Sequence, residues 1–158
     1  MKIKLIVVGK LKEKYLLDAC NEYLKRLSKY AKTEVIEVNE EKISDESFSM
    51  QAIAMQKEGQ RILENVGLSD YVILSDLHGK EIDSVEFSSL LENAMTKGAS
   101  TFAIIIGGSY GLDDEMRKRA DFSMCLSKMT FPHQLTRVIV LEQIYRSMKI
   151  LHNEKYHK

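Results

Sequence analysis

The segment Thr101–Ile106 constrains the fold of this chain more than any other. Five of its six side chains are apolar. A nearly continuous apolar run is typical of a central strand in a parallel sheet that is covered on both faces. Gly107 and Gly108 follow at once, and glycine allows a tight turn or a close approach of the backbone to a ligand. We therefore expect a buried strand that ends in a glycine turn.

Strand patterns and helix patterns alternate along the whole chain. Strand patterns cover residues 2–8, 34–38, 71–74, 101–106 and 121–126. Helical spacing covers residues 12–30, 47–65, 83–97, 112–120 and 133–151. This alternation predicts an α/β fold with a mainly parallel sheet and helices on both faces, and the length predicts a single domain over residues 1–158.

Local signals add detail to the expected second helix and to the segment after the third strand. Ser44 or Asp45 is expected to cap the second helix. Its inward residues are expected to be Ile53, Ala54, Ile62 and Leu63. The segment His78-Gly79-Lys80 is expected to form a turn.

Composition favours a cytoplasmic protein. No apolar stretch approaches the ~20 residues that a membrane span needs, and the first residues turn polar too soon for a signal peptide. Cys20 and Cys125 lie far apart and without metal-ligand spacing, which predicts two buried, reduced thiols. The 4 histidines are scattered, so we expect no metal site.

The net charge of zero hides a strong asymmetry. Residues 1–33 carry nine Lys/Arg against three Asp/Glu, residues 34–114 five against sixteen, and residues 115–158 nine against four. The two basic ends form one basic face if they meet in space. The alternative is an evenly mixed, solvated surface.

The last helix is apolar over much of its circumference. Its main apolar arc spans roughly 160° and contains Val138, Val140, Leu141, Ile144, Tyr145, Met148 and Leu151. Such a helix either crosses the core or forms a subunit interface. We favour a contact in a twofold homodimer.

Three segments are expected to meet at one ligand site. Leu74, Gly107–Gly108 and Leu126–Phe131 each end or follow a strand, and the carboxyl ends of parallel strands share one edge of a sheet, where α/β proteins bind ligands. The glycines at 107, 108 and 111 match neither the dinucleotide-binding fingerprint nor the nucleotide P-loop. Leu74, Leu126, Met129 and Phe131 would supply apolar walls.

Four motifs in order resemble the ribosomal RNA large subunit methyltransferase H family, which belongs to the SPOUT superfamily. These motifs are residues 74–80 (LSDLHGK), 106–112 (IGGSYGL), 126–133 (LSKMTFPH) and the tail Tyr156-His157-Lys158. The resemblance extends over essentially the full length. The chain departs from the family pattern at Ser75, where an acid is usual; Asp76 follows one place later.

The resemblance implies a deep trefoil knot near the C-terminal end, which is an exception to the usual unknotted topology. It implies S-adenosylmethionine as the cofactor, and a homodimer that methylates ring nitrogen 3 of a pseudouridine in large-subunit ribosomal RNA of the assembled ribosome. By position, the cofactor-binding residues are Leu74, Gly107, Gly108, Leu126, Ser127, Lys128, Met129, Thr130 and Phe131.

Because the cofactor supplies an activated methyl group, the protein has to bind, align and handle one proton. Candidates for that role follow the third ligand segment and are His133, Arg137, Arg146, Tyr156 and His157. His133 either acts in the site or simply begins the last helix. Arg137 is either a site cation or a paired interface arginine. The tail either frays or contacts an RNA base.

Two other functions are compatible with the residues alone. One is a ribosome-associated RNA-binding protein without catalysis, suggested by the basic ends and the lack of a compelling base. The other is a different nucleotide-binding α/β enzyme, suggested only by the glycine turn.

Overall fold

The computed structural model describes all residues, 1–158, as five strands alternating with five helices. In chain order they are β1 (Lys2–Val8), α1 (Lys14–Leu27), β2 (Lys32–Val38), α2 (Phe48–Leu63), β3 (Tyr71–Glu81), α3 (Ser84–Thr96), β4 (Thr101–Ile106), α4 (Asp114–Arg119), β5 (Phe122–Cys125) and α5 (His133–Leu151). The predicted order of elements is confirmed. None of the five helices is long and apolar enough to cross a membrane.

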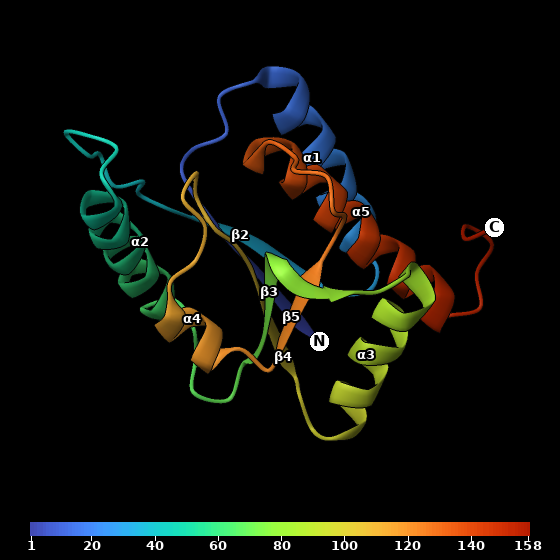
Figure 1. Ribbon diagram of the computed structural model, residues 1–158. Helices are drawn as coiled ribbons and strands as arrows, with labels where there is room; N and C mark the ends of the chain where they lie inside the picture. The colour runs from blue at the N-terminus through green and yellow to red at the C-terminus, as the bar shows by residue number, and fades with distance from the viewer.

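The strands form one sheet in the order β2-β1-β4-β3-β5, and every pairing is parallel. All five strands therefore end at the same edge. Helices α1, α3 and α5 cover one face, and α2 and α4 cover the other (Figure 1). This architecture confirms the predicted parallel α/β class. The trefoil knot that the family resemblance implies stays a prediction.

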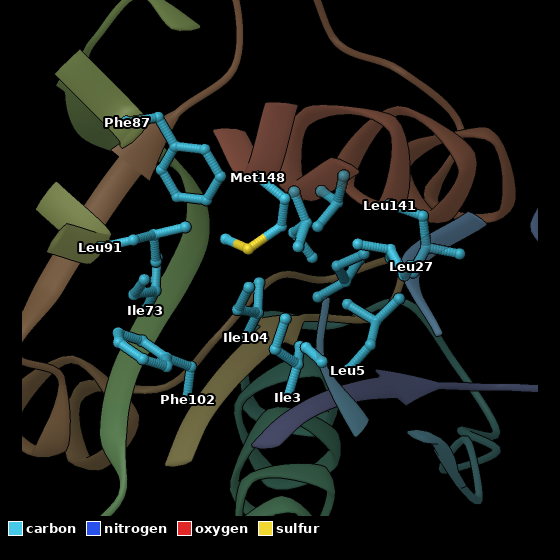
Figure 2. Packing of buried hydrophobic residues seen from close by; sticks show 14 of the residues in the cluster. Ile3, Leu5, Leu27, Ile73, Phe87, Leu91, Phe102, Ile104, Leu141 and Met148 are labelled. Carbon is cyan, nitrogen blue, oxygen red and sulfur yellow. The ribbon is translucent and has the colours of Figure 1, made fainter. Parts of the chain in front are cut away.

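Strand β4 divides the core into two halves because its side chains alternate between the two faces of the sheet. Phe102, Ile104 and Ile106 join the larger cluster under α1, α3 and α5. Ala103 and Ile105 join the smaller cluster under α2 and α4. Figure 2 shows the larger cluster, in which side chains of three helices meet those of the sheet: Ile3, Leu5, Leu27, Ile73, Phe87, Leu91, Phe102, Ile104, Leu141 and Met148.

Helix α5 lies against the core rather than standing clear of it. Four residues of its predicted apolar arc are buried in the larger cluster: Val140, Leu141, Ile144 and Met148. The arc therefore packs within its own chain, against the sheet and beside α1 and α3. The predicted homodimer contact stays a prediction.

Both thiols, Cys20 and Cys125, are buried, as expected.

The start of α2 differs from the expectation. Ser47, rather than Ser44 or Asp45, caps the helix by accepting the Met50 N–H, while Asp45 accepts the Ser47 N–H. Ala54 and Ile62 are buried as predicted, but Ile53 is exposed. The buried face of α2 follows Ala54, Glu58 and Ile62, which repeat every four residues, and Ile53 is turned about 100° away from Ala54.

Strand β3 is longer than predicted, and the expected turn at residues 78–80 is wrong. Its pairing with β5 shifts register between Ser75 and Lys80. Gly79 lies so close to β5 that a Cβ atom there would stand 2.6 Å from the Met124 carbonyl carbon. The four residues between these two positions, 76–79, have no partner on β5. Three of them, Asp76, Leu77 and His78, line the cavity described next, together with Ser75.

Candidate active site

A cavity of about 440 Å³ opens at the carboxyl edge of the sheet. This volume is in the range of sites that bind small molecules and cofactors. Its lining comes from the irregular part of β3, the turn after β4, the loop after β5 and the first turn of α5. The lining residues are Ser75, Asp76, Leu77, His78, Ile106–Leu112, Arg117, Leu126, Ser127, Met129–His133 and Thr136. The predicted convergence of three strand ends on one crevice is confirmed.

Two of the nine residues expected at the cofactor do not line the cavity. Leu74 is fully buried in the smaller core cluster, because it precedes Ser75 on the strand and its side chain points to the opposite face of the sheet. Lys128 extends outward, with its ammonium 3.7 Å from the Glu81 carboxylate. The other seven lie together around the cavity: Gly107, Gly108, Leu126, Ser127, Met129, Thr130 and Phe131.

The glycine turn after β4 leaves no room for a side chain at Gly107 or Gly108. A Cβ atom on Gly107 would stand 2.9 Å from the Gly111 carbonyl oxygen. Gly111 has a positive φ of 90°, which favours glycine, and its N–H donates to the Gly108 carbonyl at 3.1 Å. Gly107 and Gly108 therefore present backbone to the cavity, whereas Ser109 and Tyr110 are the members of the turn that carry side chains.

The irregular part of β3 contributes Asp76 to a charged pair that was not predicted from the sequence. The partner of Asp76 is Arg117 on α4. The Arg117 Nε donates to Asp76 Oδ2 at 2.8 Å, and the His78 N–H donates to Asp76 Oδ1 at 3.1 Å. Burial alone would raise the pKa of Asp76, but these two donors lower it below its ordinary value. An acid directly after an apolar strand was the available signal for Asp76. Arg117 arrives from α4, and no local pattern marks it.

His133 is the one member of the predicted catalytic set that lines the cavity. It is the first residue of α5, and Pro132 occupies the N-cap position. The Thr136 hydroxyl and N–H both donate to the Pro132 carbonyl. This anchoring fixes the start of α5, so the two alternatives for His133 are compatible: it begins the helix and also faces the cavity.

Arg137 lies outside the cavity and is 1% exposed. Its guanidinium donates to Glu37 Oε1 at 2.7 Å, to the Gly9 carbonyl at 2.7 Å and to the Val8 carbonyl at 3.2 Å. It thus ties the start of α5 to the ends of β1 and β2. Of the two alternatives for Arg137, the structure shows a paired arginine, and its partner is in the same chain.

The tail residues pack on the distal part of α5. The Tyr156 hydroxyl donates to Glu142 at 3.1 Å, and the Arg146 guanidinium lies over the Tyr156 ring, 4.7 Å from its centre. Burial and the contacts of its hydroxyl raise the pKa of Tyr156 to about 12, which keeps the phenol protonated at neutral pH. His157 Nδ1 lies 3.5 Å from Arg146. Since Glu142 and Arg146 are 9 and 13 residues after His133, the tail contacts α5 roughly 14 to 20 Å along the helix from the cavity.

The loop after β5 has empty space on both sides. Leu126 and Phe131 line the 440 Å³ cavity and also a second, mostly apolar cavity of about 350 Å³. Cys125 borders the second cavity only. No group of three or more His, Cys, Asp or Glu side chains is placed to hold a metal ion.

Two solved structures with this fold are described as a methyltransferase and a probable methylase. A tRNA (m1G37) methyltransferase from Aquifex aeolicus superposes with a TM-score of 0.58 over 92% of this chain and 70% of that one, at 15% identity. A probable methylase family protein from Haemophilus influenzae gives 0.54 over 99% of this chain and 70% of that one, also at 15% identity. At such identities the likeness establishes the fold alone.

Sequence comparison establishes the family. The family model described as "Predicted SPOUT methyltransferase" matches residues 1–157. Proteins named ribosomal RNA large subunit methyltransferase H are 52% identical in Ruminiclostridium cellulolyticum and 50% identical in Clostridium perfringens, over the full length of both chains in each case. With a SPOUT-type fold and full-length identity at this level, the chain belongs to the ribosomal RNA large subunit methyltransferase H family.

Proposed function

We propose that this protein transfers a methyl group from S-adenosylmethionine to ring nitrogen 3 of a pseudouridine in large-subunit ribosomal RNA. Family membership supports ribosomal RNA methylation. The observation that carries the proposal is the cavity at the carboxyl edge of the sheet, where three strand ends meet. An α/β sheet binds its ligand at this edge.

The cavity's residues fit such a cofactor. Leu126, Met129 and Phe131 supply apolar surface that suits an adenine ring. Gly107 and Gly108 present backbone groups without side chains, which suits the close approach of a polar ligand. Asp76 supplies a carboxylate that stays ionised at neutral pH and can accept from ribose hydroxyls or an ammonium group.

The bound cofactor would supply an activated methyl group, so the remaining chemistry concerns one proton. The imide N–H of the base has to lose that proton as the nitrogen attacks the methyl carbon. His133 is the residue placed at the cavity to accept it, directly or through the solvent. The Arg117 guanidinium, also in the lining, can stabilise the negative charge that develops on the base.

Exposed lysines near the start of α5 suit an RNA substrate. Lys10, Lys12 and Lys14 are exposed, and their ammonium groups make none of the ion pairs in the structure. Their loop lies against the start of α5, since the Lys12 N–H donates to Gln134 Oε1 at 3.4 Å. With a net charge of zero, binding to free RNA should be weak, and the substrate is the assembled ribosome in the cytoplasm.

The proposal includes a homodimer. Within one chain, Tyr156 and His157 contact Glu142 and Arg146, which are roughly 14 and 20 Å along α5 from His133. At these distances they are too far away to contact a base in that chain's own cavity. Their predicted catalytic role therefore requires a second copy whose tail reaches the first copy's cavity. A mixed dimer of an H133Q chain and a Y156F chain tests this: it should recover activity that neither homodimer has. Two inactive homodimers that give only an inactive mixture would remove the tail from the site.

Calorimetry with S-adenosylhomocysteine tests the cofactor directly, and a folded sample that shows no binding would refute the proposal.

Incorporation of labelled methyl into intact ribosomes, compared with protein-free ribosomal RNA, tests the substrate. We expect incorporation only into ribosomes, at a pseudouridine whose modified nitrogen is then identified by mass spectrometry. Ribosome binding without methyl transfer would favour the non-catalytic RNA-binding alternative.

A further inference from the structure

A buried acid stands directly behind the glycine turn of the cavity. Glu58, on α2, is 2% exposed. Its Oε1 accepts the Glu41 N–H at 2.9 Å, but its Oε2 is buried and has no hydrogen-bond partner. Buried polar atoms without a hydrogen-bond partner are uncommon in folded proteins and often have a functional role.

The unpartnered oxygen touches the turn itself. Glu58 Oε2 lies 2.9 Å from the position that a Cβ atom on Gly108 would take. The next residue of α2, Gly59, packs in the same way against Asp113, whose carboxylate would stand 2.8 Å from a Cβ there. Asp113 caps α4 by accepting the Met116 N–H. One turn of α2 therefore supports both ends of the segment from Gly108 to Asp113.

The loop before α2 joins the same support. The Ser109 hydroxyl donates to Glu40 at 3.4 Å, and the adjacent Glu41 N–H is the one that Glu58 accepts. The glycine turn is thus held from behind by Glu58 and from the side by Glu40. Cofactor-binding geometry at Gly107–Gly108 depends on this support, because these two residues have no side chains of their own to anchor them.

The surroundings of Glu58 disfavour a negative charge. Lys57 and Arg61, the cations on α2, both pair with Glu41. Glu40 and Glu41 face Glu58 from the loop, and Asp113 faces the same turn of α2 from α4. Burial therefore raises the pKa of Glu58 above its ordinary value, although the Glu41 N–H opposes the rise. An ionised carboxylate would be costly at this position, because Oε2 has no hydrogen-bond partner. Gly108 also packs against Oε2 and limits its access to water.

Building on the proposed function, we propose that Glu58 is a positioning residue that holds the glycine turn in its cofactor-binding geometry only while its carboxyl is protonated. Ionisation would draw water or a cation to Oε2 and displace Gly108. The cofactor-bound state would then hold one proton that the free protein loses as the pH rises. Cofactor affinity should fall with rising pH, by up to about tenfold per pH unit above the pKa that Glu58 has in the folded protein.

Variants of the full-length protein separate this role from simple packing. E58Q keeps the size and the acceptor for the Glu41 N–H but cannot ionise. E64Q changes an exposed acid at the end of the same helix and is the matched control. We expect the dissociation constant for S-adenosylhomocysteine to rise with pH in the wild type and in E64Q and to stay nearly flat in E58Q. Parallel pH profiles for the wild type and E58Q would overturn the inference.

A second measurement uses the wild type alone and stands even if E58Q folds poorly. Calorimetry in buffers of different ionisation enthalpy counts the protons taken up when S-adenosylhomocysteine binds. We expect uptake that approaches one proton as the pH rises, and no uptake at low pH. Zero uptake at every pH would overturn the role of Glu58 and leave the proposed function intact, whereas no binding at any pH would refute the proposed function itself.

Discussion

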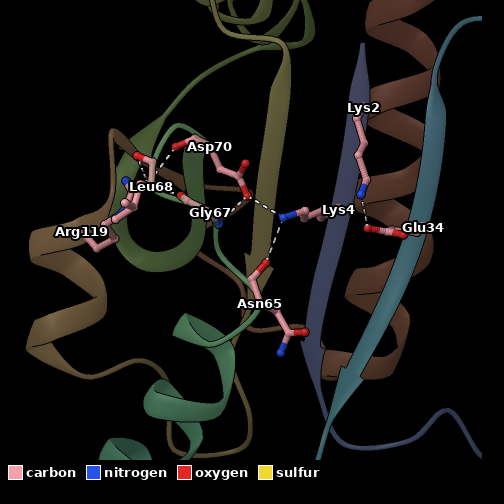
Figure 3. Close-up of polar contacts among 8 residues, drawn as sticks. All are labelled: Lys2, Lys4, Glu34, Asn65, Gly67, Leu68, Asp70 and Arg119. Atoms are coloured by element: carbon pink, nitrogen blue, oxygen red, sulfur yellow. Dashed lines mark hydrogen bonds and ion pairs between the residues drawn. The ribbon is translucent and has the colours of Figure 1, made fainter.

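The two edges of the sheet treat a buried acid in opposite ways, as Asp70 and Glu58 show. At the amino edge, the Lys4 ammonium on β1 reaches Asp70 at 2.8 Å and the Asn65 carbonyl at 3.1 Å (Figure 3). Arg119 donates to the carbonyls of Gly67 and Asp70 in the same loop. At the carboxyl edge, Glu58 keeps an oxygen without a partner behind a glycine turn.

We infer from this difference that the amino edge of the sheet contributes mainly to stability and the carboxyl edge mainly to function. Fully paired charges fix the loops of the amino edge in one arrangement. The carboxyl edge keeps a cavity, side-chain-free backbone and an unpartnered acid, which are features that lower stability and persist at functional sites. Changes at the amino edge should alter folding and leave cofactor binding alone, and changes at the carboxyl edge should do the reverse.

The largest effect is expected from G108A. The new methyl group would stand 2.9 Å from Glu58 Oε2 and 3.0 Å from Val8 Cγ1, so the turn has to move. Overpacking of this kind costs up to about 3 kcal/mol, which corresponds to about a 100-fold loss of cofactor affinity if the turn absorbs the shift. Calorimetry with S-adenosylhomocysteine measures it.

G98A is the matched control for G108A at the amino edge. Gly98 has a φ of 102° and nothing within 4 Å of its Cβ position. Its substitution should cost about 1 kcal/mol of stability through backbone strain and leave cofactor affinity unchanged. An equal loss of affinity in both variants would dissolve the distinction between the two edges.

A smaller effect, on stability alone, is expected from K4M. It removes the partner of Asp70, whose side chain is 7% exposed, and should lower the free energy of unfolding by about 2 kcal/mol. Urea denaturation measures the loss. K2M is the control, because the Lys2–Glu34 pair on the same strand is more than a third exposed and should contribute about 0.5 kcal/mol or less. Weakened cofactor binding in K4M would contradict the separation.

The smallest effect is expected from the triple variant K10Q/K12Q/K14Q. These lysines are exposed and their loop contacts the start of α5, so stability and cofactor affinity should not change. The KM for ribosomes should rise about tenfold at physiological salt, with a shallower dependence on salt. The control triple K25Q/K32Q/K97Q removes exposed lysines elsewhere. The same rise in both triples would mean that total charge, rather than this edge, attracts the RNA.

Much of the fold was predictable because apolar patterns report burial directly. The nearly all-apolar β4 was expected in the centre of the sheet and lies there. Asp83 begins α3 with a full capping box, which involves Glu86. The cap of α2 was missed because several serines and acids precede that helix, and each can cap in principle. Which one does so depends on how Ala54 and Ile62 dock on the sheet.

The site was less predictable because it combines elements that are distant in sequence. The three strand ends were found, since parallel strands share an edge. Leu74 was expected at the cavity and lies in the core, because neighbouring residues of a strand face opposite ways. Arg117 was missed because its position beside Asp76 results from the packing of α4. The distance from the tail to His133 likewise required the path of α5.

The two buried thiols provide natural reporters of local opening. Cys20 lies in α1 within the larger core cluster, and burial raises the pKa of its thiol although Arg137 opposes the rise. Cys125 ends β5, contacts the Ser127 carbonyl and borders the second cavity. Each buried thiol reacts with an alkylating reagent only when its surroundings open. The alkylation rate of each thiol therefore reports how often the structure around that thiol opens. A ligand that settles the loop after β5 should slow the Cys125 reaction and leave that of Cys20 as it was.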